Sequence, residues 1–251
     1  MSWSFREYMY KLGSQVNMDP PCTTGLDVAF ILDYTGSMGA VIDSIKGTIL
    51  NIITEIENQV VDGDYRLGLV ISDEYSGTTG VQATYQNSGS YISLPPSQKI
   101  VDTGVGITQY ITAMELFAVN NQSTFIDQLD VLNTSNFPIG NGAQGAEPLD
   151  VALDFVVNNA FLTPFRTNVA KYVFIFTDDF PGGDDDTYDT IDDDRINTLT
   201  TDCIREGIKV FVLGEGANET VWQNLATNTG GLYNVDFDEE TIISAITNTC
   251  T

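Results

Sequence analysis

The chain has 251 residues, of which 42% are hydrophobic, so it can form one large domain with a sizeable core. Its 35 acidic and 10 basic residues give a net charge of −25, which excludes nucleic acid and anionic membrane surfaces as expected partners. It contains no histidine, which excludes Ser-His and Cys-His nucleophile pairs and imidazole zinc sites, and leaves oxygen-bound Mg²⁺, Ca²⁺ or Mn²⁺ as the expected metals.

Residues 1–21 are predicted to form an N-terminal arm that precedes a domain over residues 22–251. The arm is charged and lacks the continuous apolar stretch of a signal peptide, and no apolar run in the chain approaches the length of a membrane span. We therefore expect no membrane insertion, and a location in the cytoplasm or in a particle such as a virion. Phe5, Met9 and Leu12 can form one apolar face, which would dock either on the parent domain or on a neighbouring subunit.

The first elements of the domain alternate between strand and helix. Residues 26–33, "LDVAFILD", form a nearly continuous apolar run that predicts a strand buried on both faces. Apolar residues then recur at three- and four-residue spacing over 38–60, which predicts a long amphipathic helix. Residues 65–72, "YRLGLVIS", predict a second strand.

A Gly-, Ser- and Tyr-rich region over residues 76–108 interrupts this alternation and is interpreted as an insertion or elaborated loop. The short alternations "VQATY" and "SYISL" within it are typical of edge strands or a hairpin.

The remainder returns to alternation, with Ser123 as the expected N-cap of the next helix and Cys203 as a small core residue. The sequence predicts helices over 123–133, 147–160, 195–207, 218–231 and 238–250, and strands over 171–179, 208–216 and 232–236. This pattern predicts an α/β fold with a doubly wound, mostly parallel sheet, helices on both faces and one short antiparallel edge strand.

Oxygen-bearing side chains follow two of the predicted strands. Asp33, Thr35 and Ser37 come directly after the first strand, and Asp178 and Asp179 end the strand "KYVFIFTDD". Ligands of open α/β sheets bind beyond the carboxyl ends of the strands, and carboxylates with hydroxyls are the ligands of a hard cation. Ser37 alone has a simpler interpretation as the N-cap of the following helix.

From about Leu26 to Ile246 the chain resembles the von Willebrand factor A domain, the fold shared with integrin inserted domains. "AFILDYTGSMG" is similar to the metal-ion-dependent adhesion site of that family, and "VFIFTDD" is similar to the strand that ends in its metal-associated Asp. "GIKVFVLGEGANETVWQNLATNTGGLYNV" is similar to the penultimate strand, helix and last strand of the family.

The resemblance implies a set of metal ligands. Asp33, Thr35 and Ser37 match the first loop of the family's site, and Asp178 matches the third. The second loop usually supplies a Thr or Asp, and its best match within "GNGAQGAEPLDVAL" is Gln144, which offers a carbonyl oxygen but no charge.

Glu147 or a water molecule would substitute if Gln144 does not bind the metal, and Asp179 is a further auxiliary candidate. A site that has decayed into a turn and a cap is the alternative. The resemblance implies a non-catalytic adhesion or protein-interaction module, in which a carboxylate from a partner protein completes the coordination of the cation.

Two features remain open at this point. Seven Asp residues between Asp184 and Asp194 either hold an extra Ca²⁺ or form a solvated loop whose last carboxylates favour the N-terminus of the next helix, and the second interpretation is preferred. Cys22 and Cys250 flank the domain and are either free thiols or, as in some extracellular members of the family, a bridge between its termini.

Two other functions are compatible with the sequence. A structural subunit of a large assembly, such as a phage or virus particle, would fit the aromatic arm and the Thr-, Asn- and Gly-rich insertion, with a structural or vestigial metal site. A Mg²⁺-dependent phosphatase-like enzyme would use Asp33 as nucleophile, but such enzymes need a carboxylate two residues later, where this chain has Thr35. We therefore expect that the protein is not an enzyme.

Overall fold

The structure is a computed structural model that describes residues 25–59, 64–76, 84–142, 145–183, 185, 187–214 and 220–234. The N-terminal arm, Cys22, Cys250, Gln144 and the helix expected over residues 238–250 lie outside the described residues. No helix within the described ranges is both long enough and apolar enough to cross a membrane.

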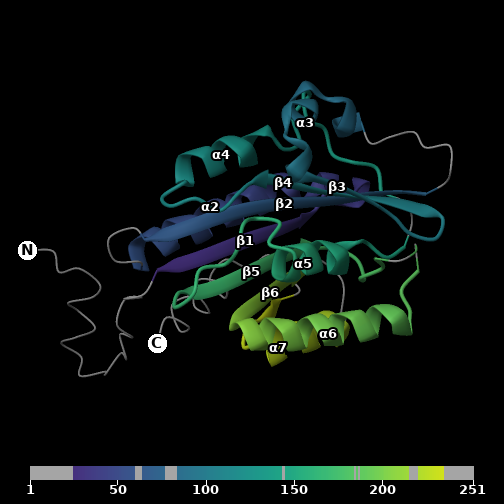
Figure 1. The fold of residues 1–251 in the computed structure, drawn as a ribbon. Helices are drawn as coiled ribbons and strands as arrows, with labels where there is room; N and C mark the ends of the chain where they lie inside the picture. The colour runs from purple at the N-terminus through teal and green to yellow at the C-terminus, as the bar shows by residue number, and fades with distance from the viewer. Residues whose placement is uncertain are drawn as a thin grey trace, which may run out of the picture.

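The described strands form one seven-stranded sheet in the order β3-β4-β2-β1-β5-β6-β7 (Figure 1). The strands are β1 (Leu26–Asp33), β2 (Tyr65–Ser76), β3 (Lys99–Thr103), β4 (Ile107–Glu115), β5 (Ala170–Thr177), β6 (Ile208–Gly214) and β7 (Tyr233–Asn234). The neighbours β2-β1, β1-β5, β5-β6 and β6-β7 pair in parallel. At one edge, β4 pairs with β2 and β3 pairs with β4 in antiparallel fashion. The predicted α/β class with a mostly parallel sheet is therefore confirmed.

The helices lie largely where periodicity predicts them. They are α2 (Ile42–Gln59), α3 (Gly89–Ser93), α4 (Gln122–Val131), α5 (Leu149–Asn158), α6 (Thr190–Glu206) and α7 (Thr220–Asn228). Short 3₁₀ segments cover Gly36–Ala40, Thr84–Asn87 and Pro96–Gln98.

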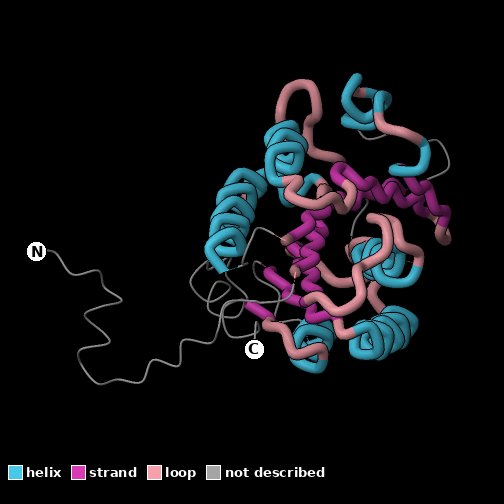
Figure 2. Tube along the Cα trace, turned by 60° about the vertical axis from the view of Figure 1, so that its left-hand side comes forward, coloured by secondary structure: helices cyan, strands magenta, loops and turns pink. Residues whose placement is uncertain are grey.

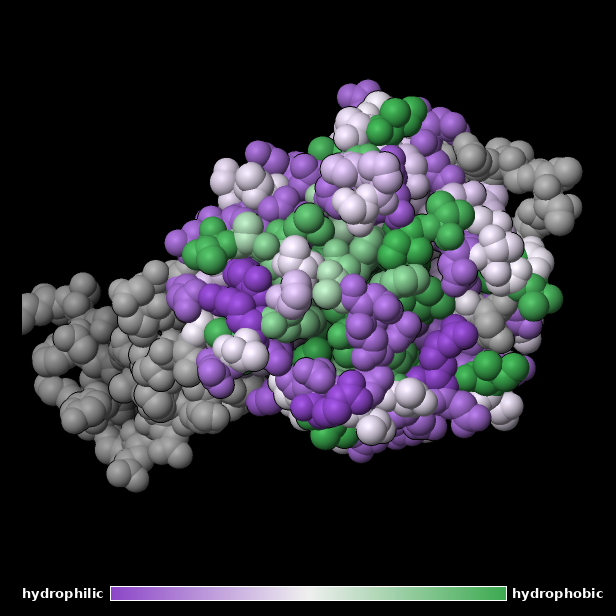
Figure 3. Space-filling model, in the orientation of Figure 1, coloured by the Kyte–Doolittle hydropathy of each residue, from purple (hydrophilic) through white to green (hydrophobic). Residues whose placement is uncertain are grey.

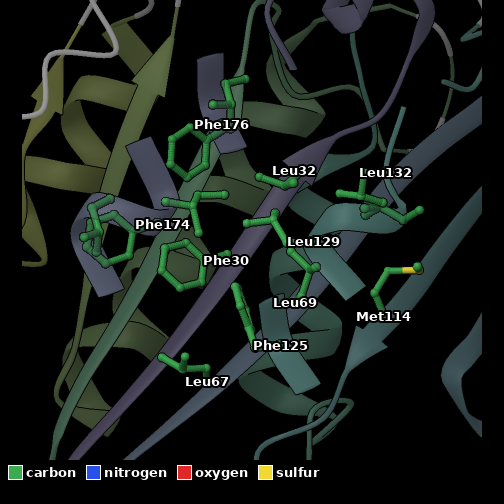
Figure 4. Close-up of a cluster of buried hydrophobic side chains, with 14 of the residues drawn as sticks. Phe30, Leu32, Leu67, Leu69, Met114, Phe125, Leu129, Leu132, Phe174 and Phe176 are labelled. Carbon is green, nitrogen blue, oxygen red and sulfur yellow. The ribbon is translucent and has the colours of Figure 1, made fainter. Parts of the chain in front are cut away.

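Alternate residues of β1 belong to two different core clusters, as expected for a strand without a solvent-facing side. The first cluster joins β1 to apolar side chains of α2 and α4. Phe30 stands at its centre, with its ring centroid 5.3 Å from that of Phe174 on β5 and 5.4 Å from that of Phe125 on α4 (Figure 4). This cluster fixes the position of β1 relative to β5, the two strands that carry the candidate site.

The second cluster contains Ala29 and Ile31 of β1 together with apolar residues of α5, α6 and α7. Cys203 is one of its buried members, as predicted. Figure 2 shows the strands as one layer with helical segments beside it. On the side of the molecule seen in Figure 3, apolar residues gather in the middle and hydrophilic residues surround them.

Three local predictions are wrong. "SYISL" forms the short helix α3 rather than an edge strand, because Ser88 caps it by accepting a hydrogen bond from the Tyr91 amide (3.1 Å). Thr84–Asn87, at the end of "VQATY", forms a 3₁₀ turn. Ser123 lies inside α4, which begins after Asn121, whose side chain binds the backbone of Leu67 on β2 instead of capping the helix.

The antiparallel edge is also larger than expected. It holds β4 as well as β3, although the sequence predicted a single short edge strand. Polar residues at buried positions of β4, Gln109 and Thr112, hide the strand from a search for apolar runs.

Candidate metal centre

The first and third loops of the candidate site meet because β1 and β5 are neighbours in the sheet. The two strands pair in parallel, with Leu32 opposite Phe176, so Asp33 and Thr177 end the strands side by side. Asp178 follows directly after β5. The structure therefore brings Asp33 and Asp178 to the same point at the carboxyl edge of the sheet.

Asp33 is a fully buried carboxylate held by hydroxyl and amide donors. Its Oδ1 accepts hydrogen bonds from the Thr35 amide (3.0 Å) and the Thr35 hydroxyl (2.6 Å), which closes a tight turn after β1. Its Oδ2 accepts a hydrogen bond from the Thr177 hydroxyl (3.1 Å). The carboxylate is thus fixed from both strands.

A chain of oxygens continues from Asp33 to the surface. The hydroxyls of Thr35 and Ser37 lie 3.2 Å apart, and the Ser37 hydroxyl donates to Asp178 Oδ1 (3.1 Å). Thr35 is buried, Ser37 is exposed and Asp178 is half-buried. Ser37 lies inside the 3₁₀ turn Gly36–Ala40 rather than at its N-cap position, which Thr35 occupies without a side-chain capping bond.

The second loop approaches the same place through its glycines. The Gly140 amide donates to the carbonyl of Tyr34 (2.9 Å), and the Gly142 amide donates to Asp73 Oδ1 (3.0 Å). A Cβ at Gly140 would lie 2.3 Å from the Asp73 carboxyl carbon, and one at Gly142, whose φ is +68°, would lie 2.9 Å from Thr35 Cβ. Only glycine allows the loop to pack this closely.

Glu147 is the acidic residue that this loop brings to the site. It is buried. A side-chain hydrogen bond from Thr35 lowers the pKa of its carboxyl group, but burial and neighbouring negative charges raise this pKa by more. Its backbone amide donates to the carbonyl of Phe180 (2.7 Å), and its carbonyl accepts from the Gly182 amide (3.0 Å), so the second and third loops are joined here. Gln144, the residue expected to fill this position, lies outside the described residues.

Asp179 is committed to the structure of the third loop. Its carboxylate accepts a hydrogen bond from the Phe180 amide (2.8 Å), and its carbonyl accepts from Trp222 Nε1 on α7 (2.9 Å). The described contacts give Asp179 a role in shaping the loop that carries Asp178.

Burial and mutual repulsion leave three acidic groups near the site difficult to ionise. Burial is the main cause that raises the pKa of Asp33 to about 7, and the charge of Asp178 adds to it. Burial likewise raises the pKa of Asp73 to about 8 and that of Glu147 to about 11, with further contributions from Asp33 to both. Among the described residues, none of these three acids forms an ion pair with Lys or Arg. A cation would supply the missing charge.

The oxygens present fit a hard divalent cation. Asp33, Thr35, Ser37 and Asp178 converge, and Glu147 Oε2 and Asp73 Oδ2 are buried acceptors without a hydrogen-bond partner. Within the described ranges, no three carboxylate or thiol groups are arranged to hold a metal by themselves. A metal at this place would therefore depend on the hydroxyls of Thr35 and Ser37.

Two residues at this edge are absent from the sequence-based site. Asp73 lies on β2 beyond the predicted end of the strand at residue 72, and Thr177 binds the Asp33 carboxylate. The signal for Asp73 is present in the sequence, because an acidic pair, Asp73–Glu74, follows the predicted strand over residues 65–72 as Asp178–Asp179 follows β5.

The acidic run before α6 has a structural role at its end. Asp189 caps the helix by accepting from the Ile191 amide (2.6 Å), and Asp192 accepts from the Asp189 amide (2.8 Å), which forms a reciprocal capping box. The preferred interpretation of these last carboxylates, that they favour the helix N-terminus, is confirmed; Asp184 and Asp186 lie outside the described residues.

No protein-family model matches the chain, and no curated protein matches it.

Proposed function

We propose that this protein is a non-catalytic interaction module of the von Willebrand factor A type, which binds a protein partner through a divalent cation at the carboxyl edge of its sheet. The fold proposed is the doubly wound one, with helices on both faces, and the two core clusters that share β1 support it. The observation that carries the proposal is the continuous chain of oxygens from Asp33 through Thr35 and Ser37 to Asp178.

In this proposal Asp33, Thr35, Ser37 and Asp178 hold Mg²⁺, Ca²⁺ or Mn²⁺, and a water molecule takes the place expected of Gln144. Ser37 and Asp178 are the accessible members of the set, so a ligand from outside would approach on their side. A bound cation would attract a partner's carboxylate to a surface whose own charge otherwise repels it.

Calorimetric titration of Mg²⁺, Ca²⁺ and Mn²⁺ tests the metal part of the proposal. Asp178→Asn keeps the shape of a half-buried side chain while removing a ligand charge, so we expect metal affinity at the edge to fall at least about tenfold. Asp127→Asn, at an exposed position of α4, is the matched control and should bind as the wild type does. Equal affinities in the wild type and Asp178→Asn would contradict the proposed site.

Titration with acetate, followed by NMR, tests the partner chemistry. With Mg²⁺ present, acetate should shift the amide resonances of Gly36 and Ser37, because these residues lie on the exposed side of the oxygen chain. The shifts should disappear in EDTA and in Asp178→Asn. Shifts of the same size without a metal would count against a carboxylate that completes the coordination of the cation.

A further inference from the structure

A second group of buried oxygens lies beside the candidate edge site, on β2 and β4, two residues beyond the position of β2 that pairs with Asp33. Glu74 on β2 and Gln109 on β4 face each other across the antiparallel pair. Val70 and Ile111, at even spacing from them, belong to the second core cluster, so both side chains lie on that face of the sheet. Each has no exposed surface.

The loops before α5 and after β5 cover this pair. Gln109 Nε2 donates to the Gly183 carbonyl, and the neighbouring Gly182 amide donates to the Glu147 carbonyl (3.0 Å). Glu147 also lies close to the strand pair, since it bridges to Pro181, next to these glycines, and the following Pro148 accepts a hydrogen bond from Ser72 of β2 (3.3 Å). Glu74, Gln109 and Glu147 therefore surround one buried region.

The atoms left over in this region are acceptors. Gln109 Oε1 and Glu147 Oε2 are buried without a hydrogen-bond partner, and Glu147 as a whole is only 6% exposed. Among the described residues, the guanidinium of Arg195 pairs with Asp150 beside Gly183 (2.9 Å). Leaving buried acceptors unsatisfied destabilises the folded state, so an electropositive occupant is expected.

We infer that Glu74, Gln109 and Glu147 bind a second cation, a buried Ca²⁺, beside the candidate edge site. Two carboxylates match a charge of +2, and an amide carbonyl is a common third ligand of calcium, which tolerates irregular geometry and takes its remaining ligands from water or backbone oxygens. The proposed protein ligands are therefore two carboxylates and one amide oxygen, and not three acidic groups. A Ca²⁺ bound to these three residues would link β2 and β4 to the loop that contains Glu147.

Calcium stoichiometry, measured by equilibrium dialysis, separates this inference from the proposed function. The wild type should bind two Ca²⁺, Asp178→Asn should lose the edge ion alone, and Glu74→Gln should lose the inner ion alone. One ion that Glu74→Gln retains and Asp178→Asn loses would overturn the inference and leave the proposed function standing. One ion that Asp178→Asn retains and Glu74→Gln loses would overturn the proposed function and leave the inference standing. No bound ion in the wild type would overturn both.

Thermal unfolding gives a second test that does not need two resolved binding events. Saturating Ca²⁺ should raise the melting temperature of the wild type several degrees more than that of Glu74→Gln, because only the wild type gains the inner ion. The comparison is made for each protein between EDTA and Ca²⁺, so any effect of the substitution on the metal-free protein cancels. An equal rise in both proteins would overturn the inference.

Gln109→Glu covers the case in which Glu74→Gln fails to fold. It adds a third carboxylate to the same position, so it should bind Ca²⁺ at least about tenfold more tightly than the wild type while melting lower in EDTA. A lower melting temperature in EDTA without tighter calcium binding would again overturn the inference.

Discussion

At the scale of single residues, Asp73 shows how a buried acid can organise a loop. It has no exposed surface, its Oδ1 accepts from the Gly142 amide, and its carboxyl group fills the space that a side chain at Gly140 would need. Its Oδ2 has no hydrogen-bond partner, so ionisation of this group is costly. The pKa of Asp73 is raised to about 8, chiefly by burial.

We expect the metal-free protein to lose stability as the pH rises from about 4, the ordinary pKa of Asp, towards 8. Over this range the unfolded chain releases the Asp73 proton while the folded chain retains it, so deprotonation favours unfolding. Asp73→Asn keeps an acceptor for the Gly142 amide and cannot ionise, so its free energy of unfolding should fall less over the same range. Urea denaturation in EDTA at pH 5, 6, 7 and 8 measures the difference.

Asp127→Asn, which changes the same charge at an exposed position of α4, should follow the wild-type pH dependence in that experiment. If Asp73→Asn and the wild type lose stability in parallel, the Asp73 carboxyl group is ionised throughout this pH range and burial does not raise its pKa.

At the scale of elements, α6 is stabilised at both ends by residues that sequence rules recognise. Asp189 and Asp192 form the capping box at its start, and Gly207, with a φ of +69°, ends it in the left-handed conformation. This arrangement gives the last part of the acidic run a role in helix initiation.

Asp189→Ala should lower the free energy of unfolding by about 1 kcal/mol, because the Ile191 amide loses its acceptor and the capping box is broken. Asp194→Ala is the matched control, since it removes an exposed carboxylate of the same run from within the helix. Chemical denaturation of the two variants measures the difference. A loss of equal size in both would point to the general charge of the run rather than to the cap.

Elements with a simple burial pattern could be predicted from the sequence, and those with a mixed pattern could not. β1 is apolar at nearly every position and buried throughout, so its predicted bounds agree with the structure. β4 buries Gln109 and Thr112 among its apolar residues, and a pattern search reads such polar positions as loop. The short α3 begins after Ser88, whose side chain accepts a capping hydrogen bond from the Tyr91 amide. This bond stabilises a helix, although the alternating apolar and polar residues suggested a strand.

The candidate site divides in the same way. Asp33, Thr35, Ser37 and Asp178 could be predicted together, because the carboxyl ends of neighbouring parallel strands necessarily meet. The acidic pair at residues 73–74 could indicate that Asp73 lies at this edge, but its bond with the Gly142 amide could not be predicted, because that bond depends on how the glycine loop folds back over β2. That contact joins residues far apart in the sequence and has no local pattern.

At the scale of the whole molecule, β1 carries a buried acid at each end, and the two ends are neutralised differently. Asp27 accepts hydrogen bonds from Arg66 Nε (2.8 Å) and Arg166 Nε (2.9 Å), and the backbone amide of Arg166 donates to it as well (2.7 Å). Burial alone would raise the pKa of Asp27, but these two arginines lower it overall. Asp33 has hydroxyl and amide donors instead, and its pKa is raised.

The two ends should therefore respond to the same substitution with opposite signs. Asp27→Asn leaves the partly buried guanidinium of Arg66 without its counter-charge and removes one of the two carboxylates that pair with Arg166, so we expect a loss of about 3 kcal/mol in the free energy of unfolding at pH 7.5. Asp33→Asn in EDTA should be neutral or stabilising, because the amide oxygen keeps both bonds from Thr35 and a buried charge is removed.

In saturating Mg²⁺ the wild type should gain stability by mass action, about 2.7 kcal/mol at a hundred times Kd, while Asp33→Asn gains little. Urea denaturation of the three proteins with and without Mg²⁺ measures all of these differences. A destabilised Asp33→Asn in EDTA, with no effect of Mg²⁺ on the wild type, would show instead that the carboxyl end of β1 is a self-sufficient turn and that its oxygens are arranged for the fold alone.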